Sequence, residues 1–213
     1  MLYKETVSPV LLNLLHKLFG HRELDDFVLV GGTALSLRIG NRRSIDIDLF
    51  IIGDFPVDDT LPIFLKENGF NFHQQNRFKG GLLGHINNVK VDFIRHAYPW
   101  VVQPSVIEHI RIASLEDIAA MKLNAIAGNG TRLKDFVDIA YLSGYMSLSS
   151  MLDYYENKYP DINGVMGLKS LCYFDDIDFA VDIDYINKGM NWELIKKRIL
   201  SMVENPEKQF SRL

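Results

Sequence analysis

The alternating segment Ile45-Asp46-Ile47-Asp48-Leu49 constrains the fold more than any other part of the chain. Successive side chains of a β-strand point to opposite faces, so a strand here would place the apolar residues on one face and Asp46 and Asp48 on the other. The two carboxylates would then lie about 7 Å apart at their Cα atoms. Like charges this close are unfavourable without a cation between them, and Mg²⁺, which prefers oxygen ligands, meets that requirement.

A third acid follows the same pattern in the segment 89–93, where the valines and Phe93 share a face and Asp92 lies opposite. If this strand runs beside the first, Asp92 joins Asp46 and Asp48. Three carboxylates on neighbouring strands can hold two metal ions roughly 3.5–4 Å apart, the arrangement used for in-line displacement at phosphorus. The sequence therefore predicts that these three acids bind two Mg²⁺ ions, with Mn²⁺ as the alternative.

A glycine pair, Gly31-Gly32, precedes the acidic segment. Glycines let the backbone approach a ligand closely, and the N-terminus of a helix after such a turn attracts anions. The turn is followed by further candidate contacts to a triphosphate: Thr33, Arg42, Arg43 and Ser44. For the two arginines, the alternative is a surface loop without a ligand.

Apolar periodicity and turn residues divide the chain into two parts. Strands are expected over 27–30, 44–52, 70–78, 82–86 and 89–95, with a turn at Asn87-Asn88. Helices are expected over 9–19, from residue 34, over 58–68, from 114 to 127, from 133 to 141, and near 148–158, 164–173 and 192–204. The predicted fold class is α/β (α+β), with a mixed-sheet core over residues 1–112 and a helical domain over 113–213 packed against it.

Lys122 in the helical part lies four residues from an isoleucine on either side, so it shares the apolar face of its helix. An inward-facing lysine needs a partner. A triphosphate in a cleft between the two parts would serve, and so would Asp135 or Asp138 across the helical hairpin. These two acids face away from the apolar stripe of their own helix and can line the other wall of that cleft. Their alternative is a solvated helix face with a Lys134–Asp138 pair.

Two further Asp-Ile-Asp segments, 176–178 and 182–184, show that the motif alone is weak evidence. Neither has a glycine pair before it or a strand acid after it, so we expect a solvated loop or a partner surface there. The six histidines show no metal-ligand spacing and are expected to be structural or on the surface.

Composition excludes several classes of protein. The net charge of −4 gives no overall basic surface for nucleic acid, although a local patch remains open. One cysteine cannot form a disulfide within the chain, which fits a reducing cytoplasm. The N-terminus lacks the pattern of a signal peptide, and no apolar run approaches the roughly 20 residues that span a bilayer. We therefore expect a cytoplasmic protein without a membrane partner.

Together, the glycine pair, the Asp-x-Asp strand and the later strand acid resemble the signature of the polymerase-β-like nucleotidyltransferase superfamily. Downstream, segments 120–126 and 130–139 resemble the AbiEii/AbiGii abortive-infection branch, with its Lys-x-x-Ala and Asp-Phe-x-Asp elements. The resemblance covers about residues 25–142. It departs at Asn129, where the family pattern would carry an arginine, whose guanidinium asparagine cannot replace at a phosphate.

The resemblance implies a metal-dependent nucleotidyltransferase that moves a nucleotidyl group from a nucleoside triphosphate to RNA, a protein or a small molecule. Asp46 and Asp48 would hold both metals, and Asp92 would hold the catalytic metal and help to activate the acceptor hydroxyl. The predicted catalytic residues are Asp46, Asp48, Asp92, Lys122 and Asp135. The predicted nucleotide-binding residues are Gly31, Gly32, Thr33, Arg43, Ser44, Lys122 and Asp138.

A member of this branch would be the toxin of a toxin–antitoxin or phage-defence pair, with a cognate antitoxin protein as partner. Two alternatives stay open: an aminoglycoside-type small-molecule nucleotidyltransferase, and a non-catalytic nucleotide-binding module. A glycosyltransferase that uses Asp-x-Asp with Mn²⁺ is more distant, because the glycine turn before the acids favours nucleotidyl transfer.

Overall fold

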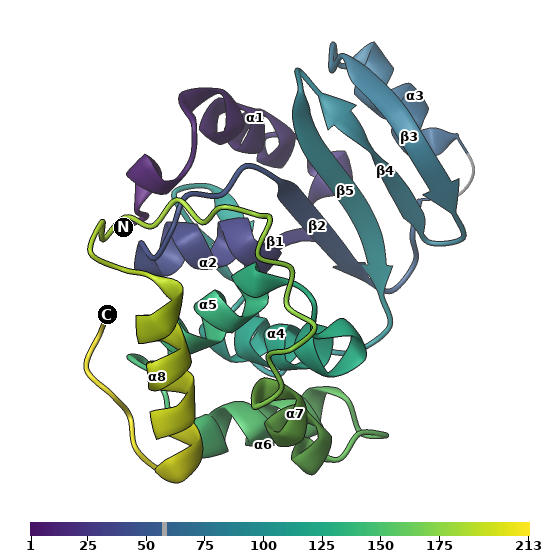
Figure 1. The fold of residues 1–213 in the computed structure, drawn as a ribbon. Coiled ribbons are helices and arrows are strands. Elements are labelled where there is room, and N and C mark those ends of the chain that lie inside the picture. The colour runs from purple at the N-terminus through teal and green to yellow at the C-terminus, as the bar shows by residue number, and fades with distance from the viewer. Residues whose placement is uncertain (57–58) are drawn as a thin grey trace.

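A seven-stranded mixed sheet forms the N-terminal part of the protein, in the order β3-β4-β5-β2-β1-β7-β6. Strands β1 to β5 are labelled in Figure 1. The structure is a computed structural model that describes residues 1–56 and 59–213. Its strands are β1 (Phe27–Val30), β2 (Ile47–Ile52), β3 (Phe72–Phe78), β4 (Gly81–Ile86), β5 (Val89–His96), β6 (Ser105–Ile107) and β7 (Ile110–Ile112). The helices are α1 (Pro9–Phe19), α2 (Gly31–Ile39), α3 (Thr60–Glu67), α4 (Leu115–Asn129), α5 (Leu133–Leu142), α6 (Leu148–Lys158), α7 (Gly164–Leu171) and α8 (Trp192–Glu204). Two 3₁₀ turns, Lys4–Thr6 and Arg22–Leu24, lie on either side of α1.

The central strands combine both pairing directions. β2 runs antiparallel to β1 and parallel to β5, while β1 also pairs in parallel with β7. All four residues of β1 are buried, and β2 alternates between buried and half-buried residues. The sheet therefore needs cover on both faces. The predicted α/β class, with a mixed sheet followed by helices, is confirmed.

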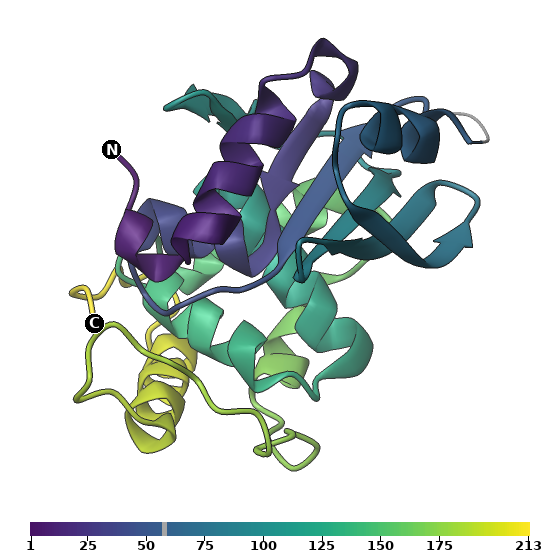
Figure 2. The same ribbon diagram turned by 90° about the horizontal axis from the view of Figure 1, so that it is seen from above.

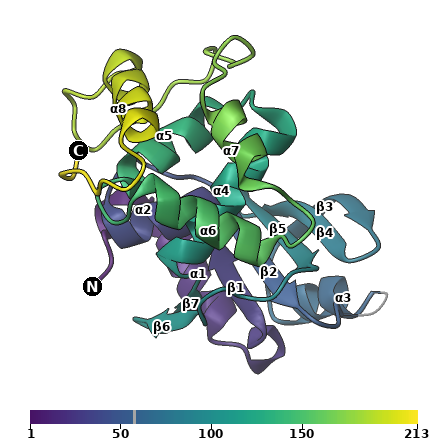
Figure 3. The same ribbon diagram turned by 90° about the horizontal axis from the view of Figure 1, so that it is seen from below.

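Helices cover the two faces of the sheet from different parts of the chain. α1 crosses one face (Figure 2), whereas α2 and α4 lie on the other, with α6 and α7 outside them (Figure 3). The helix that starts at Gly31 touches β1, β2, α4 and α5, so it lies between the sheet and the C-terminal helices. One hydrophobic cluster runs from α1 through the sheet to α8. A site between the sheet and the helices is therefore held from both sides.

Several local signals in the sequence act as expected. The Ser8 hydroxyl accepts from the amide of Leu11 and caps α1 at Pro9. Asn87 and Asn88 take φ of 50° and 66° in the turn between β4 and β5. Ser114 caps α4 by accepting from the amide of Asp117. These ends are fixed by side chains within four residues, which is why the sequence predicts them.

Other boundaries differ from the expectation. α2 begins at Gly31 rather than at residue 34, and α4 continues to Asn129. The helix expected over 58–68 is α3 at Thr60–Glu67, and its predicted first residue lies outside the described residues. The β6–β7 hairpin was not predicted. Its strands have only three residues each, too few to show an alternating pattern. Its turn has positive φ at Glu108 and His109, and glutamate and histidine are not among the residue types that predict such a turn.

No helix in the described ranges is both long and apolar enough to pass through a bilayer.

Candidate active site

The acid pair is set by strand register. Asp48 of β2 lies directly beside Asp92 of the parallel strand β5, and Val30 at the end of β1 is paired with Asp48 on the other side. The prediction that the two acidic strands are neighbours is confirmed. The carboxylates open into a cavity of about 450 Å³ between the sheet and helices α4 and α5. Its charged lining consists of Asp46, Asp48, Lys90, Asp92, Lys122, Arg132 and Asp135.

Charge is concentrated at this pair. Burial, followed by the neighbouring Asp92, raises the pKa of Asp48. Asp92 is buried, and its Oδ2 lies 2.7 Å from the ammonium of Lys90, whereas its Oδ1 is buried without a hydrogen-bond partner among the described residues. A buried carboxylate oxygen without a partner is costly. Two adjacent carboxylates, one of which has an oxygen without a hydrogen-bond partner, therefore have the chemistry that a divalent cation requires of its ligands.

Asp46 is the point at which the structure corrects the strand prediction. β2 starts at Ile47, so Asp46 is not part of the alternation, and Ile45 is 68% exposed instead of buried with Ile47. The reason is tertiary: the Thr33 hydroxyl donates to the Asp46 carbonyl, and the Ser44 amide donates to the carbonyl of Thr6. These contacts replace sheet pairing beyond the end of β1. Asp46 nevertheless lines the acidic cavity.

Within residues 1–56 and 59–213, the structure shows no ready-made cage of three metal ligands. Among the residues that the structure describes, no group of three or more His, Cys, Asp or Glu side chains is arranged to hold one metal ion. Mg²⁺ is usually held by one or two carboxylates together with water and substrate phosphates, rather than by an all-protein cage. Asp48 and Asp92, with Asp46 at the same cavity, are the residues that fit this mode.

Gly31 brings the backbone against the acid pair. Its φ is +70°, and a Cβ atom at this position would overlap Oδ2 of Asp48. Position 31 therefore requires glycine for two reasons: the left-handed backbone conformation, and the lack of room for a Cβ atom beside Asp48. Because α2 begins here, the free amides at its N-terminus lie beside the carboxylates at the same cavity.

Replacing Gly31 with alanine is expected to lower activity about 100-fold, because displacing Asp48 by about 1 Å misaligns the reacting groups. The matched control is Gly69→Ala, since Gly69 has φ +71° and its nearest neighbour is the Lys17 ammonium at 3.8 Å. Both variants are expected to lose about 1–2 kcal/mol of stability from the left-handed backbone. Turnover and thermal unfolding of the two proteins separate the effects; equal activity in both would refute the contact with Asp48.

Gly32, Thr33 and Ser44 lie behind the cavity rather than in its lining. A Cβ atom at Gly32 would overlap the guanidinium of Arg42, and the Thr33 hydroxyl lies 2.8 Å from that of Ser44. Thr33 is buried. These residues fix the loop that carries Asp46, and their predicted contact with a nucleotide remains a prediction.

Lys122, Asp135, Asp138 and Arg42 form one buried charge cluster. The Lys122 ammonium lies 2.6 Å from Asp135 Oδ1 and 2.7 Å from Asp138 Oδ2. Arg42 binds both Asp138 oxygens, at 2.8 and 2.9 Å, and Asn41 donates to the same carboxylate at 2.9 Å. Both acids are buried, so the alternative of a solvated helix face is wrong. Lys122 and Asp135 reach the cavity, whereas the fully buried Asp138 positions Lys122 and Arg42.

This cluster gives an expected pH dependence of stability. Burial alone would raise the pKa of Asp138, but Arg42 and Lys122 outweigh it and lower the pKa from 3.8 to about 2. The stabilisation is therefore fully present above about pH 4 and is lost as the pH falls toward 2, a change of about 2 kcal/mol. Urea unfolding at several pH values should show the difference between the wild type and Asp138→Asn narrowing over this range. A constant difference would contradict the assignment.

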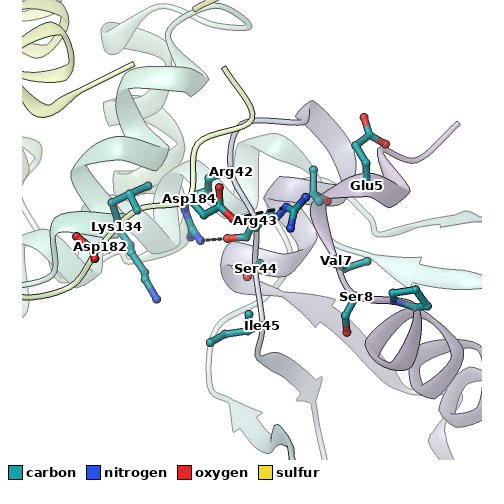
Figure 4. A pocket seen from close by; sticks show the side chains of 13 residues that line it. Glu5, Val7, Ser8, Arg42, Arg43, Ser44, Ile45, Lys134, Asp182 and Asp184 are labelled. Atoms are coloured by element: carbon teal, nitrogen blue, oxygen red, sulfur yellow. Dashed lines mark hydrogen bonds and ion pairs between the residues drawn. The ribbon is translucent and has the colours of Figure 1, made fainter. Parts of the chain in front are cut away.

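Arg43 lies at a different cavity, of about 510 Å³, which is lined by residues 42–45 of the loop before β2 (Figure 4). There its amide donates to the Asp184 carbonyl at 2.8 Å, and its guanidinium lies 3.6 Å from the Asp184 carboxylate. Asp184 belongs to a C-terminal strap, residues 175–186, which also bonds to Thr131 through the amide of Asp178. The aspartates of this acidic segment, expected as a solvated loop or a partner surface, are exposed as in a solvated loop, and its backbone also bonds to two loops near the site.

Three basic residues that line the acidic cavity were not predicted from the sequence. Lys90 lies two residues before Asp92 on the same strand face, so alternation alone indicated it. Arg132 supplies a guanidinium 3.9 Å from Asp135. His96 continues the face of Asp92 at the far end of β5. That all three line the same cavity is evident only from the way the strands and helices pack together.

An acid pair on adjacent strands, a helix that starts at Gly31 and basic residues from following helices meet at one cavity, as expected for the polymerase-β-like nucleotidyltransferase class. Two structures from Helicobacter pylori share the fold. JHP933 superposes with a TM-score of 0.54 at 19% identity, covering 94% of this chain and 93% of its own. A second protein, described as a candidate nucleotidyltransferase, gives 0.57 at 20% identity, covering 94% and 96%.

Sequence comparison narrows the class to one family. The family model described as "Nucleotidyl transferase AbiEii toxin, Type IV TA system" matches residues 14–79 and 54–209. An uncharacterized protein of Aquifex aeolicus is 31% identical over 188 residues, which cover 85% of this chain and 90% of the relative. The chain belongs to the AbiEii nucleotidyl transferase toxin family.

Proposed function

We propose that this protein transfers a nucleotidyl group from a nucleoside triphosphate to an acceptor hydroxyl, with a divalent cation bound at Asp48 and Asp92. The observation that carries the proposal is the register of these two acids on adjacent parallel strands, with the start of α2 against them. Asp46 at the same cavity is the third candidate ligand. When bound, Mg²⁺ would neutralise phosphate charge and polarise the α-phosphorus.

The protein's own groups would divide the remaining work. Gly31 at the start of α2 and Lys122 line the charged end of the cavity, and the α2 amides and the Lys122 ammonium would hold the phosphates. Arg132 would add a second cationic contact from the helical part. Asp92 would bind the cation through one carboxylate oxygen and accept the proton of the attacking hydroxyl at the other. A bond forms from the oxygen of the acceptor hydroxyl to the α-phosphorus as the bond from the α-phosphorus to the α–β bridging oxygen breaks, and pyrophosphate leaves.

The acceptor class can be identified by experiment. Purified protein would be incubated with Mg²⁺ and each α-labelled nucleoside triphosphate, together with total RNA, protein extract or a pool of small molecules. Label in one fraction, lost in an Asp48→Asn/Asp92→Asn double variant, would identify RNA, protein or a small molecule as the acceptor. Magnesium-dependent nucleotide binding without transfer to any fraction would instead favour a non-catalytic binding module.

Family membership supports a further part of the proposal, a role as the toxin of a toxin–antitoxin pair. Expression of the wild-type protein is expected to arrest the growth of a bacterial host, whereas the double variant is expected to be harmless at equal protein levels. A cognate antitoxin would restore growth. Equal growth with both proteins would count against toxicity without bearing on transfer.

A further inference from the structure

The acidic cavity has a second end without charge. Phe50 is the next residue after Asp48 on the same face of β2, and it lies in register with Ile94 of β5. Both residues line the cavity, as does His96 further along β5, and Met121 of α4 and Tyr159 at the end of α6 complete this end. A single cavity therefore runs from carboxylates and cations to apolar and aromatic surface.

His96 contributes a polar ring to the aromatic end of the cavity. Its imidazole stacks on Phe50 at 5.2 Å and 26° and on Trp100 at 6.4 Å and 29°, and it meets Tyr159 edge-on at 6.2 Å. Within the described chain no hydrogen bond reaches this ring, and its Nε2 atom is buried without a partner. Packing thus fixes the ring while leaving its hydrogen-bonding capacity unused. Burial lowers the pKa of His96 to about 4, so at neutral pH the ring offers one donor and one acceptor.

We propose that this aromatic end binds a nucleobase, whose plane packs against Phe50 and Tyr159 and whose edge hydrogen-bonds to His96. The inference rests on the proposed function, because a nucleotide matches both ends of the cavity. Its phosphates would lie at the charged end, and its flat ring with a polar edge would lie at the aromatic end. An aliphatic ligand would leave the imidazole nitrogen without a partner. Aromatic surfaces bind all bases by stacking, and a single polar edge adds a preference among them.

The test is the binding of AMP, GMP, CMP and UMP, measured by titration calorimetry without turnover. His96→Leu removes the hydrogen bond at similar volume, and Phe50→Leu removes the ring. Each is expected to weaken the best-bound monophosphate by about tenfold or more, the loss typical of one base contact. The matched control is His73→Leu, which changes an exposed histidine of β3 outside the cavity. Thermal unfolding of all variants shows whether a loss of binding reflects a loss of fold.

The base can belong to the donor or to the acceptor, and a non-hydrolysable triphosphate separates the two. If the subsite takes the donor base, the triphosphate analogue blocks the monophosphate, and His96→Leu weakens the analogue. If it takes the acceptor base, the monophosphate still binds beside the analogue, and His96→Leu leaves analogue binding unchanged. Either pattern supports a nucleobase subsite.

Unchanged monophosphate affinity in folded His96→Leu and Phe50→Leu proteins would overturn the inference. So would a protein that binds no monophosphate while it transfers label from a triphosphate, and in that case the proposed function would stand. Monophosphate binding that depends on His96, in a protein that never transfers label, would support the subsite and count against the transferase. The two failures are therefore distinguishable.

Discussion

An Asp48→Asn variant is expected to lose transfer activity on the order of 10³-fold while it remains folded, because several kcal/mol of transition-state stabilisation depend on this carboxylate. Asparagine keeps the size of the side chain and removes the charge that a cation needs. Burial and Asp92 already raise the pKa of Asp48, so removing its charge also relieves repulsion in the free protein. The variant is expected to be as stable as the wild type or slightly more stable.

The chain provides its own control for this experiment. Asp182 begins a second Asp-Ile-Asp segment in the C-terminal strap, and its side chain is exposed. Asp182→Asn changes the same residue type in the same local sequence and is expected to retain wild-type activity. Initial rates and thermal unfolding of the three proteins provide the comparison. Comparable losses in both variants would show that the strand register at Asp92 confers no special role.

An Asp138→Ala variant is expected to lose about 3–5 kcal/mol of unfolding free energy, because it leaves buried cations without their shared partner. Asp138 joins α5 to α4 through Lys122 and to the loop before β2 through Arg42 and Asn41. All four side chains are buried or nearly so. The loss should exceed that of a surface substitution by several kcal/mol.

Chemical denaturation measures this loss directly, with Asp153→Ala as the control on an exposed position of α6. The double variant Asp138→Ala/Arg42→Met is expected to recover part of the stability, since it removes one of the stranded charges together with the acid. A loss below about 1 kcal/mol in Asp138→Ala would mean that the cluster is solvated rather than buried.

The sequence predicts those parts of the site that depend on short-range periodicity. Alternation around Asp48 and Asp92 puts each acid on the polar face of its strand, and the spacing of Lys122 puts it on the inner face of α4. These are properties of about five residues at a time. Pairing of the two strands in parallel register then follows from the fold, which the sequence predicted only as a mixed sheet.

The features that the sequence did not predict depend on distant partners. The start of β2 is set by Thr6 and Thr33, which hold Ser44 and Asp46 out of the sheet. The sequence presents Arg42 as a candidate phosphate ligand, whereas in the structure its guanidinium binds Asp138, which lies 96 residues away in the chain. Neither contact has a signal within the local sequence, because each depends on how the 3₁₀ turn Lys4–Thr6, α2 and α5 pack around one loop.

The position of the label on the donor tests the central claim most directly. Protein, Mg²⁺ and the responsive acceptor fraction are supplied with a nucleoside triphosphate labelled at either the α- or the γ-phosphate. Label from the α-position should appear in the acceptor, with pyrophosphate released in equal amount and no signal from the Asp48→Asn variant. Label from the γ-position in the acceptor, or transfer that persists in the variant, would contradict nucleotidyl transfer at the Asp48–Asp92 pair.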